Sequence, residues 1–471
     1  MRHYNLCVIG SGPAGQKGAI QAAKLGKKVC VIEKRMDVGG AAVEFGTIPS
    51  KAFREAILRI TGVYSTAPKA EDFSKARTQT FAGLRGSCFS VIKAEIDMVR
   101  NHFAGNGIDV YSATGSFKDA HTVEAKGEHA AQMVHADHFL IATGTRPAKP
   151  EAFPFDGENV LTSDELLDLS GLPHSMIVVG GGVIGTEYTS MLAALGVRVT
   201  IIEGRNRLLD FVDAEITEAL QYHLRQAGVT LRLGEKVTGI RTIDAPAGAR
   251  TIDNIMAEAT LESGKTLRAD ALLYAVGRQG NTEGLNLGAV NLAADDRGRI
   301  KVNKYGQTEV GHIYAAGDVV GFPALASTSM EQGRLAACHM FGLPSETVAE
   351  LLPYGIYAIP EISRVGWTEE KLTAAGIPYE AGIAQYKEIA RGQLVGDEIG
   401  MLKLLIHQET RVLLGVHIIG TGATELVHIG QAVIAHKGTV DYFVNTVFNY
   451  PTLAECYKVA ALNGMNKLRS V

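Results

Sequence analysis

Long apolar runs, an excess of one charge and closely spaced cysteines are all missing from this sequence of 471 residues. No stretch stays apolar over the roughly 20 residues that a membrane-spanning helix needs. The N-terminus runs into a strand pattern without the apolar segment of a signal peptide. A net charge of −4 gives no electrostatic case for nucleic acid or an anionic membrane. We therefore expect a cytoplasmic protein that binds neither nucleic acid nor a membrane.

Cysteine is scarce and scattered, which limits the redox and metal chemistry open to the chain. The odd number of cysteines argues against a secreted disulfide framework, and no two have the spacing of a redox pair or a metal-ligand set. We expect no metal site. Cys7 and Cys30 lie in apolar strand patterns and are interpreted as small buried residues. The cysteines are Cys7, Cys30, Cys88, Cys338 and Cys456.

Glycine, by contrast, is abundant at 53 residues, and one group of glycines begins a dinucleotide-binding pattern. An apolar strand at 5–9 runs into Gly10, Gly12 and Gly15, spaced Gly-x-Gly-x-x-Gly. A helical stretch follows, and a second strand ends at Glu33. In this pattern the first glycine makes a tight turn, the second lets the backbone reach a pyrophosphate, and the third allows close helix packing. Glu33 is expected to accept hydrogen bonds from ribose hydroxyls.

The same pattern occurs a second time. A strand at 177–179 leads into Gly180, Gly182 and Gly185, a helix follows, and the next strand ends at Glu203. The first glycine and the acid are 23 residues apart in both copies. A single glycine motif is weak evidence, but two copies with matching strands, helix and acid imply two dinucleotides on one chain.

The remaining segments suggest how the chain divides into domains. Apolar strands at 139–147 and 272–278 each turn out of a nucleotide-binding unit. A later strand ends at Asp318, and we assign it to the first unit because an acid at the carboxyl end of such a strand faces the ligand crevice. We predict a first dinucleotide-binding domain (1–150 and 280–348), a second (151–279), and an interface domain (349–471).

These motifs resemble the flavoprotein family that contains dihydrolipoamide dehydrogenase and glutathione reductase, over essentially the whole chain. The resemblance implies FAD on the first domain, NAD or NADP on the second, and a homodimer formed by the C-terminal domain. The predicted fold is α/β, with two Rossmann-like dinucleotide-binding domains and a C-terminal α+β dimerisation domain. By this resemblance FAD contacts Gly10, Gly12, Gly15, Glu33, Gly39, Gly40, Lys51, Gly115, Thr143, Gly144 and Asp318, and the nicotinamide dinucleotide contacts Gly180, Gly182, Gly185, Glu203 and Gly277.

One segment departs from that family. Its disulfide reductases have Gly-Gly-x-Cys-x-x-x-x-Cys-x-Pro-[Ser/Thr]-Lys beside the flavin, whereas the two cysteine positions here are Ala42 and Thr47. Neither residue forms a thiolate or a disulfide, so thiol–disulfide exchange is chemically unavailable. Thr47 has two interpretations, a hydrogen bond to the flavin or simple space filling.

A second departure agrees with the first. The family has the catalytic sequence His-Pro-Thr-x-x-Glu near its C-terminus. In this chain Tyr450 stands at the histidine position, and Glu455 stands at the glutamate position. A tyrosine with a pKa near ~10 does not replace a histidine near ~6.5 as a base at neutral pH. We interpret both residues as structural. Segments 46–52, 448–452 and 460–464 are similar to the subfamily of soluble pyridine nucleotide transhydrogenases, which moves hydride between NADPH and NAD through FAD alone.

Lys51 and Glu187 are the candidate catalytic residues. The family places the lysine ammonium near flavin N5, where negative charge develops on reduction. Glu187 follows the last glycine of the second motif by two residues. We expect it to form an ion pair with Lys51 that holds the lysine in place and protonated. The alternative is an ordinary glutamate on a helix surface.

Glu203 bears on the choice of nicotinamide dinucleotide. An acid here suits the 2′-hydroxyl of NAD and opposes a 2′-phosphate by up to about 4 kcal/mol at close range. Arg205 and Arg207 follow it and offset that repulsion if they fold over the ribose. As plain surface charges they would not. NAD is therefore the expected dinucleotide, and NADP is the second.

Together these features predict a homodimeric FAD enzyme that transfers hydride between NADPH and NAD. One alternative is an NAD(P)H dehydrogenase of diaphorase type, which passes electrons to a quinone, a dye or oxygen. Another is a non-catalytic dinucleotide-binding protein or a subunit of a dehydrogenase complex. The presence of Lys51 and Glu187 argues against the non-catalytic alternative.

Overall fold

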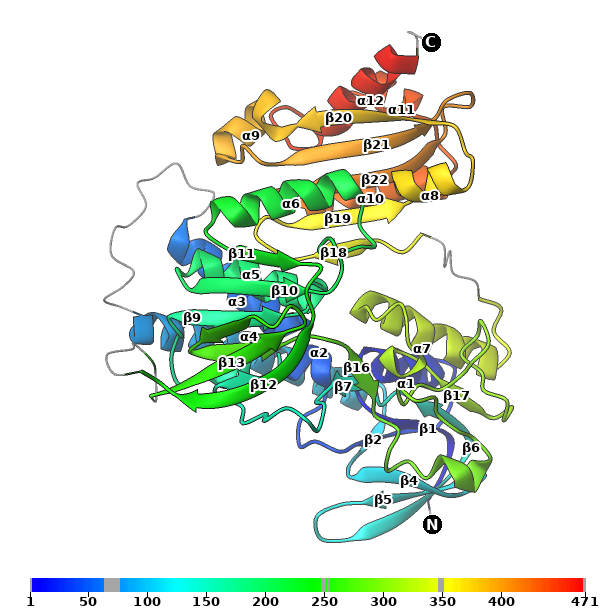
Figure 1. The fold of residues 1–471 in the computed structure, drawn as a ribbon. Coiled ribbons are helices and arrows are strands. Elements are labelled where there is room, and N and C mark those ends of the chain that lie inside the picture. The colour runs from blue at the N-terminus through cyan, green and yellow to red at the C-terminus, as the bar shows by residue number, and fades with distance from the viewer. Residues whose placement is uncertain (1, 63–76, 247–250, 252–253, 346–350, 469–471) are drawn as a thin grey trace. The chain divides into compact units, whose positions relative to one another are not determined.

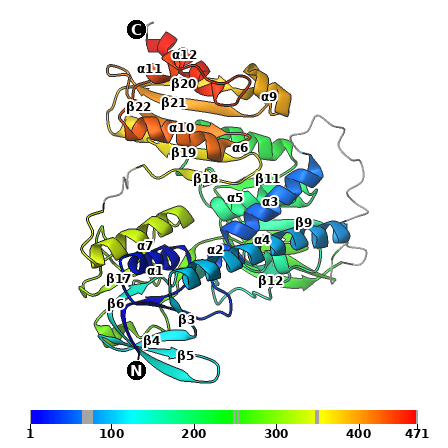
Figure 2. The same cartoon turned by 180° about the vertical axis from the view of Figure 1, so that it is seen from behind.

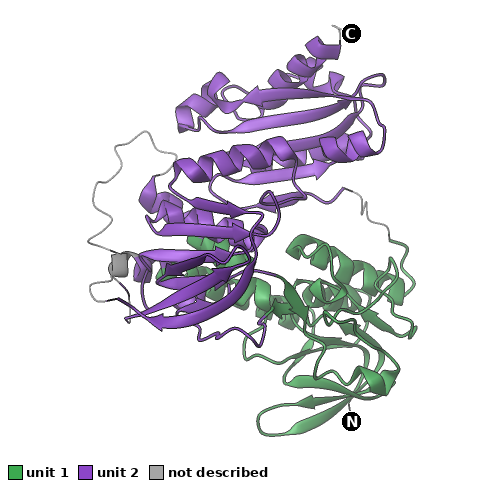
Figure 3. Cartoon of the chain, viewed as in Figure 1, with its two compact units in different colours: residues 1–53, 85–148, 277–347 green, residues 54–84, 149–276, 348–471 purple. Residues whose placement is uncertain are grey.

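The structure is a computed structural model that describes residues 2–62, 77–246, 251, 254–345 and 351–468 (Figure 1). The chain forms two compact units (Figure 3). Unit 1 consists of residues 1–53, 85–148 and 277–347, and unit 2 of residues 54–84, 149–276 and 348–471. The domain boundaries expected from the sequence stay a prediction.

Unit 1 contains a mixed sheet with the strand order β3-β2-β1-β6-β5-β4, and β17 also pairs with β6. The strands β3, β2, β1, β6 and β17 run parallel, and β4, β5 and the first half of β6 form an antiparallel arm. The β17–β6 pairing confirms that the Gly-Asp strand belongs to the first sheet. The strands are β1 (Arg2–Ile9), β2 (Val29–Glu33), β3 (Asp109–Ser112), β4 (Thr114–Asp119), β5 (Thr122–Lys126), β6 (Ala131–Ile141) and β17 (Ile313–Ala315).

Both faces of this sheet are buried, which explains why its strands are almost continuously apolar. Along β1, Leu6 and Val8 pack into one core cluster, and Cys7 and Ile9 pack into the other. The helices α1 (Pro13–Lys24) and α7 (Ala326–Met340) pack against each other over the first of these faces (Figure 2). The other elements of unit 1 are α2 (Ala41–Glu44), β7 (Thr145–Pro147), β16 (Arg278–Gly280), η2 (Leu287–Val290) and η3 (Asp318–Val320).

Two further helices have residues in both units. They are α3 (Thr47–Thr61) and α4 (Arg77–Gly105).

Unit 2 contains the second copy of the nucleotide-binding pattern. Its parallel sheet has the strand order β11-β10-β9-β15-β8, and an antiparallel sheet has the order β12-β13-β14. The strands are β8 (Val160–Leu161), β9 (Ser175–Val179), β10 (Arg198–Glu203), β11 (Thr230–Leu233), β12 (Val237–Asp244), β13 (Ile255–Leu261), β14 (Thr266–Ala269) and β15 (Ala271–Tyr274). The helices are α5 (Val183–Ala194) and α6 (Ala214–Gln226), with a short η1 (Leu166–Asp168).

The C-terminal part of unit 2 is an antiparallel sheet with the order β18-β19-β22-β21-β20. Side chains alternate across it, so Leu402, Leu404 and Ile406 of β21 join the core cluster beneath α10 and α12, whereas Lys403 points to the other face. The strands are β18 (Tyr354–Ile356), β19 (Ile362–Gly366), β20 (Tyr379–Gln385), β21 (Met401–His407) and β22 (Leu413–Ile419). The helices are α8 (Glu369–Ala374), η4 (Tyr386–Glu388), α9 (Ala390–Val395), α10 (Ala423–Ala435), α11 (Asp441–Asn445) and α12 (Glu455–Leu468).

Two features are absent from the described ranges. None of the helices there is long and apolar enough to cross a membrane. Among the same residues, no three histidine, cysteine, aspartate or glutamate side chains are grouped so that they could hold a metal ion.

The contact between α1 and α7 generates a stability prediction. A Cβ atom at Gly333 would lie 2.0 Å from the backbone oxygen of Ala14, which shifts less easily than the end of a flexible side chain. We expect Gly333→Val to destabilise the protein by about 2 to 3 kcal/mol through overpacking and to lower Tm by on the order of 5 °C. Calorimetry of the purified protein measures this.

Gly86→Ala in α4 is the matched control, because no atom of the described residues lies within 4 Å of a Cβ there. Removing a glycine from an exposed helix interior should leave Tm unchanged or raise it slightly. Equal Tm values for the two variants would contradict the close packing of α1 on α7.

Candidate dinucleotide sites

The first glycine motif forms a turn that only glycine fits at two positions. Gly10 has a φ of +104°, and a Cβ there would lie 2.4 Å from the backbone oxygen of Ala142. A Cβ at Gly15 would lie 2.0 Å from the oxygen of Gly10. At Gly12, the residue that precedes α1, a Cβ would meet nothing within 4 Å. Such motifs hold a phosphate at the amides of this helix N-terminus, and the open space beside Gly12 leaves room for one.

The acid that ends β2 is tied to the same turn. Glu33 is buried, and its Oε2 accepts hydrogen bonds from the backbone amide of Ser11 at 2.9 Å and from its hydroxyl at 2.7 Å. The Ser11 hydroxyl in turn accepts from the amide of Gly39 at 3.0 Å. The sequence analysis missed Ser11, although its place between Gly10 and Gly12 could have pointed to it. Ser11 links three segments that the resemblance assigns to FAD.

Gly39 and Gly40 continue this arrangement. Their φ angles are +124° and +64°, and a Cβ at Gly40 would lie 2.8 Å from Cα of Gly12. The chain therefore passes against the first glycine loop immediately before Ala42.

Several polar groups of unit 1 fit a bound FAD. Residues 142–144 and 316–318 follow the neighbouring strands β6 and β17 at the carboxyl edge of the sheet. Within the described ranges, the buried hydroxyls of Thr143 and Thr328 have no hydrogen-bond partner. Asp318 accepts from the hydroxyls of Thr145 at 3.2 Å and Ser329 at 3.4 Å. Orphaned buried hydroxyls are rare in folded proteins, so a polar ligand is expected here.

Gly144 and Gly115 differ in their surroundings. Gly144 has a φ of +63°, and a Cβ added there would meet open space, as a ligand-facing turn requires. Gly115 is buried, and a Cβ there would lie 3.2 Å from the Ile9 side chain. Close packing alone explains a glycine at 115, so its contact with FAD stays a prediction.

The segment that carries cysteines in the disulfide reductases forms α2 and the start of α3. Ala42 lies in α2, and Thr47 is the first residue of α3. Cys88 donates to the backbone oxygen of Pro49 at 3.7 Å, but burial raises the pKa of this thiol to about 11. Cys88 is therefore protonated at neutral pH and does not replace the missing pair. Lys51 lies in α3, where its Nζ donates to the Ser50 hydroxyl at 3.3 Å.

The second glycine motif repeats the geometry of the first. Gly180 has a φ of +106°, and a Cβ there would lie 2.7 Å from the oxygen of Ala275. A Cβ at Gly185 would lie 1.9 Å from the oxygen of Gly180. Gly182 precedes α5 and again has nothing within 4 Å of a Cβ. Unit 2 thus has a second helix N-terminus that follows a glycine turn with open space beside Gly182.

The Glu203 carboxylate forms an ion pair with an arginine. Its Oε2 accepts from the Gly181 amide at 2.6 Å, and both of its oxygens accept from the Arg205 guanidinium at 2.9 Å. Burial opposes the charged carboxylate, but the hydrogen bonds from Arg205 hold the pKa of Glu203 below its ordinary value. Arg205 also donates to Asp210.

Arg207 has a different role from the one expected for a residue that folds over the ribose. Its guanidinium donates to Glu370 at 3.0 Å and to the backbone oxygen of Asp210 at 2.8 Å. Arg205 is therefore the arginine that offsets the charge of Glu203. The sequence left both arginines as equal candidates because it does not show which way each side chain turns.

Glu187 is not a helix-surface residue. It is 3% exposed on α5, and its Oε1 accepts from the backbone amide of Tyr357 at 2.8 Å. Ser190, one turn later, accepts from the amide of Ile359 at 2.9 Å. Lys51 and Glu187 belong to different units, so their expected ion pair stays a prediction.

Three further positions singled out in the sequence lie outside these clusters. Gly277 belongs to unit 1, has a φ of +81°, and accepts at its carbonyl oxygen from the amide of Ala148 at 3.3 Å. Its assignment to the nicotinamide dinucleotide stays a prediction. Tyr450 is 67% exposed, and among the described residues Glu455 Oε2 is buried without a partner.

The family of the chain follows from comparison with known proteins. Residues 4–333 match the pyridine nucleotide-disulphide oxidoreductase family, and residues 352–461 match the dimerisation domain of that family. Among solved structures, the HOCl-induced flavoprotein disulfide reductase RclA from Escherichia coli is 26% identical and covers 98% of this chain and 99% of its own, with a TM-score of 0.85. LpdA from Mycobacterium tuberculosis is 26% identical, with 97% and 99% coverage and a TM-score of 0.86.

Curated relatives are more similar in sequence. The soluble pyridine nucleotide transhydrogenase of Mycobacterium tuberculosis is 52% identical over 100% of this chain and 99% of its own length. The protein of the same name from Marinomonas is 46% identical over 99% of each chain. The matched residues, the identities and the two glycine motifs agree, and this chain belongs to the pyridine nucleotide-disulphide oxidoreductase family.

Proposed function

We propose that the protein is an FAD-dependent oxidoreductase that transfers hydride between NADPH and NAD without a redox disulfide. FAD, when bound, accepts hydride from one nicotinamide dinucleotide and donates it to another. The support comes from relatives at 45–52% identity over nearly the whole chain that are named soluble pyridine nucleotide transhydrogenases.

One observation carries the proposal. Two complete dinucleotide cradles are formed, but Ala42 and Thr47 stand where disulfide reductases have cysteines. Without a thiolate no mixed disulfide forms, so electrons have no route to a disulfide substrate. One cradle is then left for FAD and the other for nicotinamide dinucleotides, which serve in turn as hydride donor and hydride acceptor.

The residues of unit 1 bind FAD in this proposal. The amides after Gly10 and Gly12 hold its pyrophosphate, Glu33 binds a ribose, and Asp318 with Thr143 and Thr328 binds the chain that leads to the flavin. The hydrogen bonds and orphaned hydroxyls of these residues support the assignment. Gly180, Gly182 and Gly185 bind the pyrophosphate of NAD or NADP in the same way, and Glu203 faces its adenosine ribose.

Lys51 stabilises negative charge on the reduced flavin, and Glu187 orients Lys51. Burial of Glu187 at 3% exposure and the Tyr357 amide on its Oε1 support an orienting role, because both restrain the movement of the carboxylate. The match of residues 352–461 to the dimerisation domain supports a homodimer. We also propose that the protein works in the cytoplasm.

A single nicotinamide site requires ping-pong kinetics. Donor and acceptor occupy the second cradle in turn, so we expect parallel double-reciprocal plots and inhibition of NADPH binding by excess NAD. In an anaerobic titration, one equivalent of NADPH should bleach the flavin, and NAD added after removal of NADP should restore the oxidised spectrum. A flavin that bleaches but is not reoxidised by NAD would contradict the proposal and favour a diaphorase.

Lys51→Met should leave FAD bound and slow flavin reduction. The expected loss is about 2 to 4 kcal/mol in the barrier, as when one preorganised electrostatic group is removed. Stopped-flow absorbance measures the rate, and Glu187→Gln should act in the same direction. Lys24→Met, which changes an exposed lysine of α1, is the control. Reduction rates that match the control would assign Lys51 and Glu187 to structure.

Glu203 and Arg205 should shift the dinucleotide preference in opposite directions. Glu203→Ala removes the negative charge and frees Arg205, so NADP should gain about tenfold in affinity relative to NAD, or about 1.4 kcal/mol. Arg205→Leu should weaken NADP relative to NAD because Glu203 is then uncompensated. Calorimetric titration of the FAD-loaded protein gives both affinities. The same preference in both variants would place the 2′-phosphate away from Glu203.

A further inference from the structure

The loop between β10 and α6, residues 204–212, is held in a conformation that its sequence does not favour. Leu209 has a φ of +46°, a region that bulky residues rarely adopt. Leu208 and Leu209 are nonetheless fully buried. The amide of Leu209 donates to the oxygen of Gly181 at 2.9 Å, and the amide of Leu208 donates to Gln221 at 3.1 Å. A strained backbone conformation persists only where the surrounding structure enforces it. Contacts beyond these two hydrogen bonds also hold the loop in place.

One set of contacts lies at the end of the loop, on Asp213. This residue is fully buried and caps the N-terminus of α6 through the amide of Glu215. Its Oδ1 also accepts from Lys403 Nζ at 2.9 Å, and its Oδ2 from the amide of Glu369 at 3.5 Å. Lys403 and Glu369 belong to the segment that matches the dimerisation domain, so that segment fixes the point where the loop ends.

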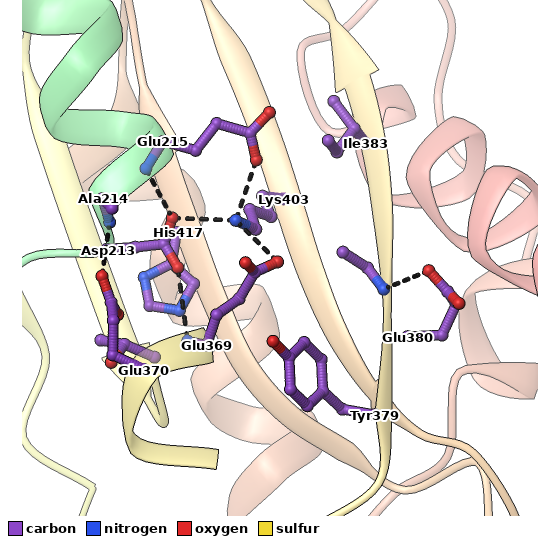
Figure 4. A network of polar contacts seen from close by, with 12 residues as sticks. Asp213, Ala214, Glu215, Glu369, Glu370, Tyr379, Glu380, Ile383, Lys403 and His417 are labelled. Atoms are coloured by element: carbon purple, nitrogen blue, oxygen red, sulfur yellow. Dashed lines mark hydrogen bonds and ion pairs between the residues drawn. The ribbon is translucent and has the colours of Figure 1, made fainter. Parts of the chain in front are cut away.

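Lys403 is the centre of this cluster (Figure 4). Its side chain is 1% exposed on β21 and lies within 3.0 Å of carboxylate oxygens of Asp213, Glu215 and Glu369. Burial alone would neutralise a lysine, but the hydrogen bond to Glu215 and the charge of Asp213 hold the pKa of Lys403 above its ordinary value. The buried, neutral His417 is its neighbour on β22. The Lys403 cluster is therefore a charged anchor rather than a solvated surface pair.

A second set of hydrogen bonds connects the dimerisation segment to the middle of the loop. Glu370 Oε1 accepts from Arg207 at 3.0 Å and from the amide of Ala214 at 3.1 Å. Arg207 donates to the backbone oxygen of Asp210, and the Asp210 carboxylate accepts from Arg205. The hydrogen bonds thus run without a break from Glu370 to the guanidinium that covers Glu203.

Packing adds a third contact with the same loop. The Arg364 guanidinium on β19 lies 5.7 Å from the ring centroid of Phe211 and 4.4 Å from that of Tyr354. Phe211 follows Asp210 directly. Two strands, β19 and β21, and the helix α8 of the dimerisation segment therefore contact the loop or Asp213, the residue that follows it.

We propose that Glu370 and the Lys403 cluster position the 204–212 loop so that Arg205 stays over Glu203, and that they thereby set the affinity for NADP relative to NAD. This rests on the proposed function, in which Glu203 faces the adenosine ribose. While Arg205 covers Glu203, the acid does not repel a 2′-phosphate. A loop that is released at Glu370 or Lys403 lets Arg205 move away, which exposes the negative charge of Glu203 to NADP and leaves NAD almost unaffected. Glu370 and Lys403 are positioning residues, because each acts on Glu203 through the loop and Arg205.

Glu370→Gln tests this inference most sharply. The glutamine keeps an oxygen for the amide of Ala214 but loses the charge that holds Arg207. We expect the Kd of NADP for the FAD-loaded protein to rise about fivefold, while the Kd of NAD changes less than twofold and kcat with saturating substrates is unchanged. Lys403→Met should shift the ratio in the same direction by a larger factor. Glu370→Gln decides the test if Lys403→Met does not fold.

Asp441→Asn is the matched control, because the Asp441–Arg411 pair also has an N–O distance of 3.0 Å and a similar exposure but does not touch the loop. Its Kd ratio should equal that of the wild type. A Glu370→Gln ratio that matches the control overturns this inference alone, even if the wild type catalyses transhydrogenation. A wild type that shows no transhydrogenation but whose ratio shifts in Glu370→Gln overturns the proposed function and supports this inference. No binding of NADP to the wild type overturns both.

Discussion

The contact on which the structure depends is the approach of a helix to the turn before it, at a distance that leaves no room for a methyl group. It occurs twice, where Gly15 meets Gly10 and where Gly185 meets Gly180. In both places the missing Cβ brings the first helical turn against the end of the first strand, so the helix amides lie at the carboxyl edge of a parallel sheet. Each dinucleotide cradle is a consequence of that approach. A third close approach, between Gly333 and Ala14, fixes α7 on α1 and completes the same face of unit 1.

Charge compensation is the second constraint, and it separates the two cradles. Glu33 accepts its hydrogen bonds from Ser11 and from the backbone amide of Arg35, which are uncharged donors. Glu203 is bound by the Arg205 guanidinium through two parallel hydrogen bonds, the geometry that makes an arginine–carboxylate pair strong. Two acids at equivalent positions of a repeat therefore present different electrostatic environments to their ligands. The difference agrees with one cradle for a resident cofactor and another for substrates that differ by a phosphate.

Much of the fold can be predicted from the sequence because its signals are local. The strands at β1, β9 and β10 follow from apolar periodicity and from glycine positions. The return of β17 to the first sheet also follows, from the acid at its end. Contacts that depend on side-chain direction are not predictable in this way. The choice of Arg205 over Arg207, the Tyr357 amide on Glu187, and the burial of Lys403 beside Asp213 each depend on how side chains turn or on residues far apart in sequence, and no local pattern indicates them.

The late position of β17 has a consequence for how the chain matures on the ribosome. The first sheet is completed by a strand that lies roughly 170 residues after its neighbour β6, a delay on the order of ten to thirty seconds at ordinary rates of synthesis. The strands of the parallel sheet of unit 2 all lie between β8 and β15 in the sequence, so they are all synthesised before β17. The nascent chain therefore carries an unfinished N-terminal sheet, in which residues 139–141 of β6 still lack their β17 partner, while the inserted nucleotide-binding segment has already been synthesised. Chaperones that cover exposed strand edges would meet this protein during that interval.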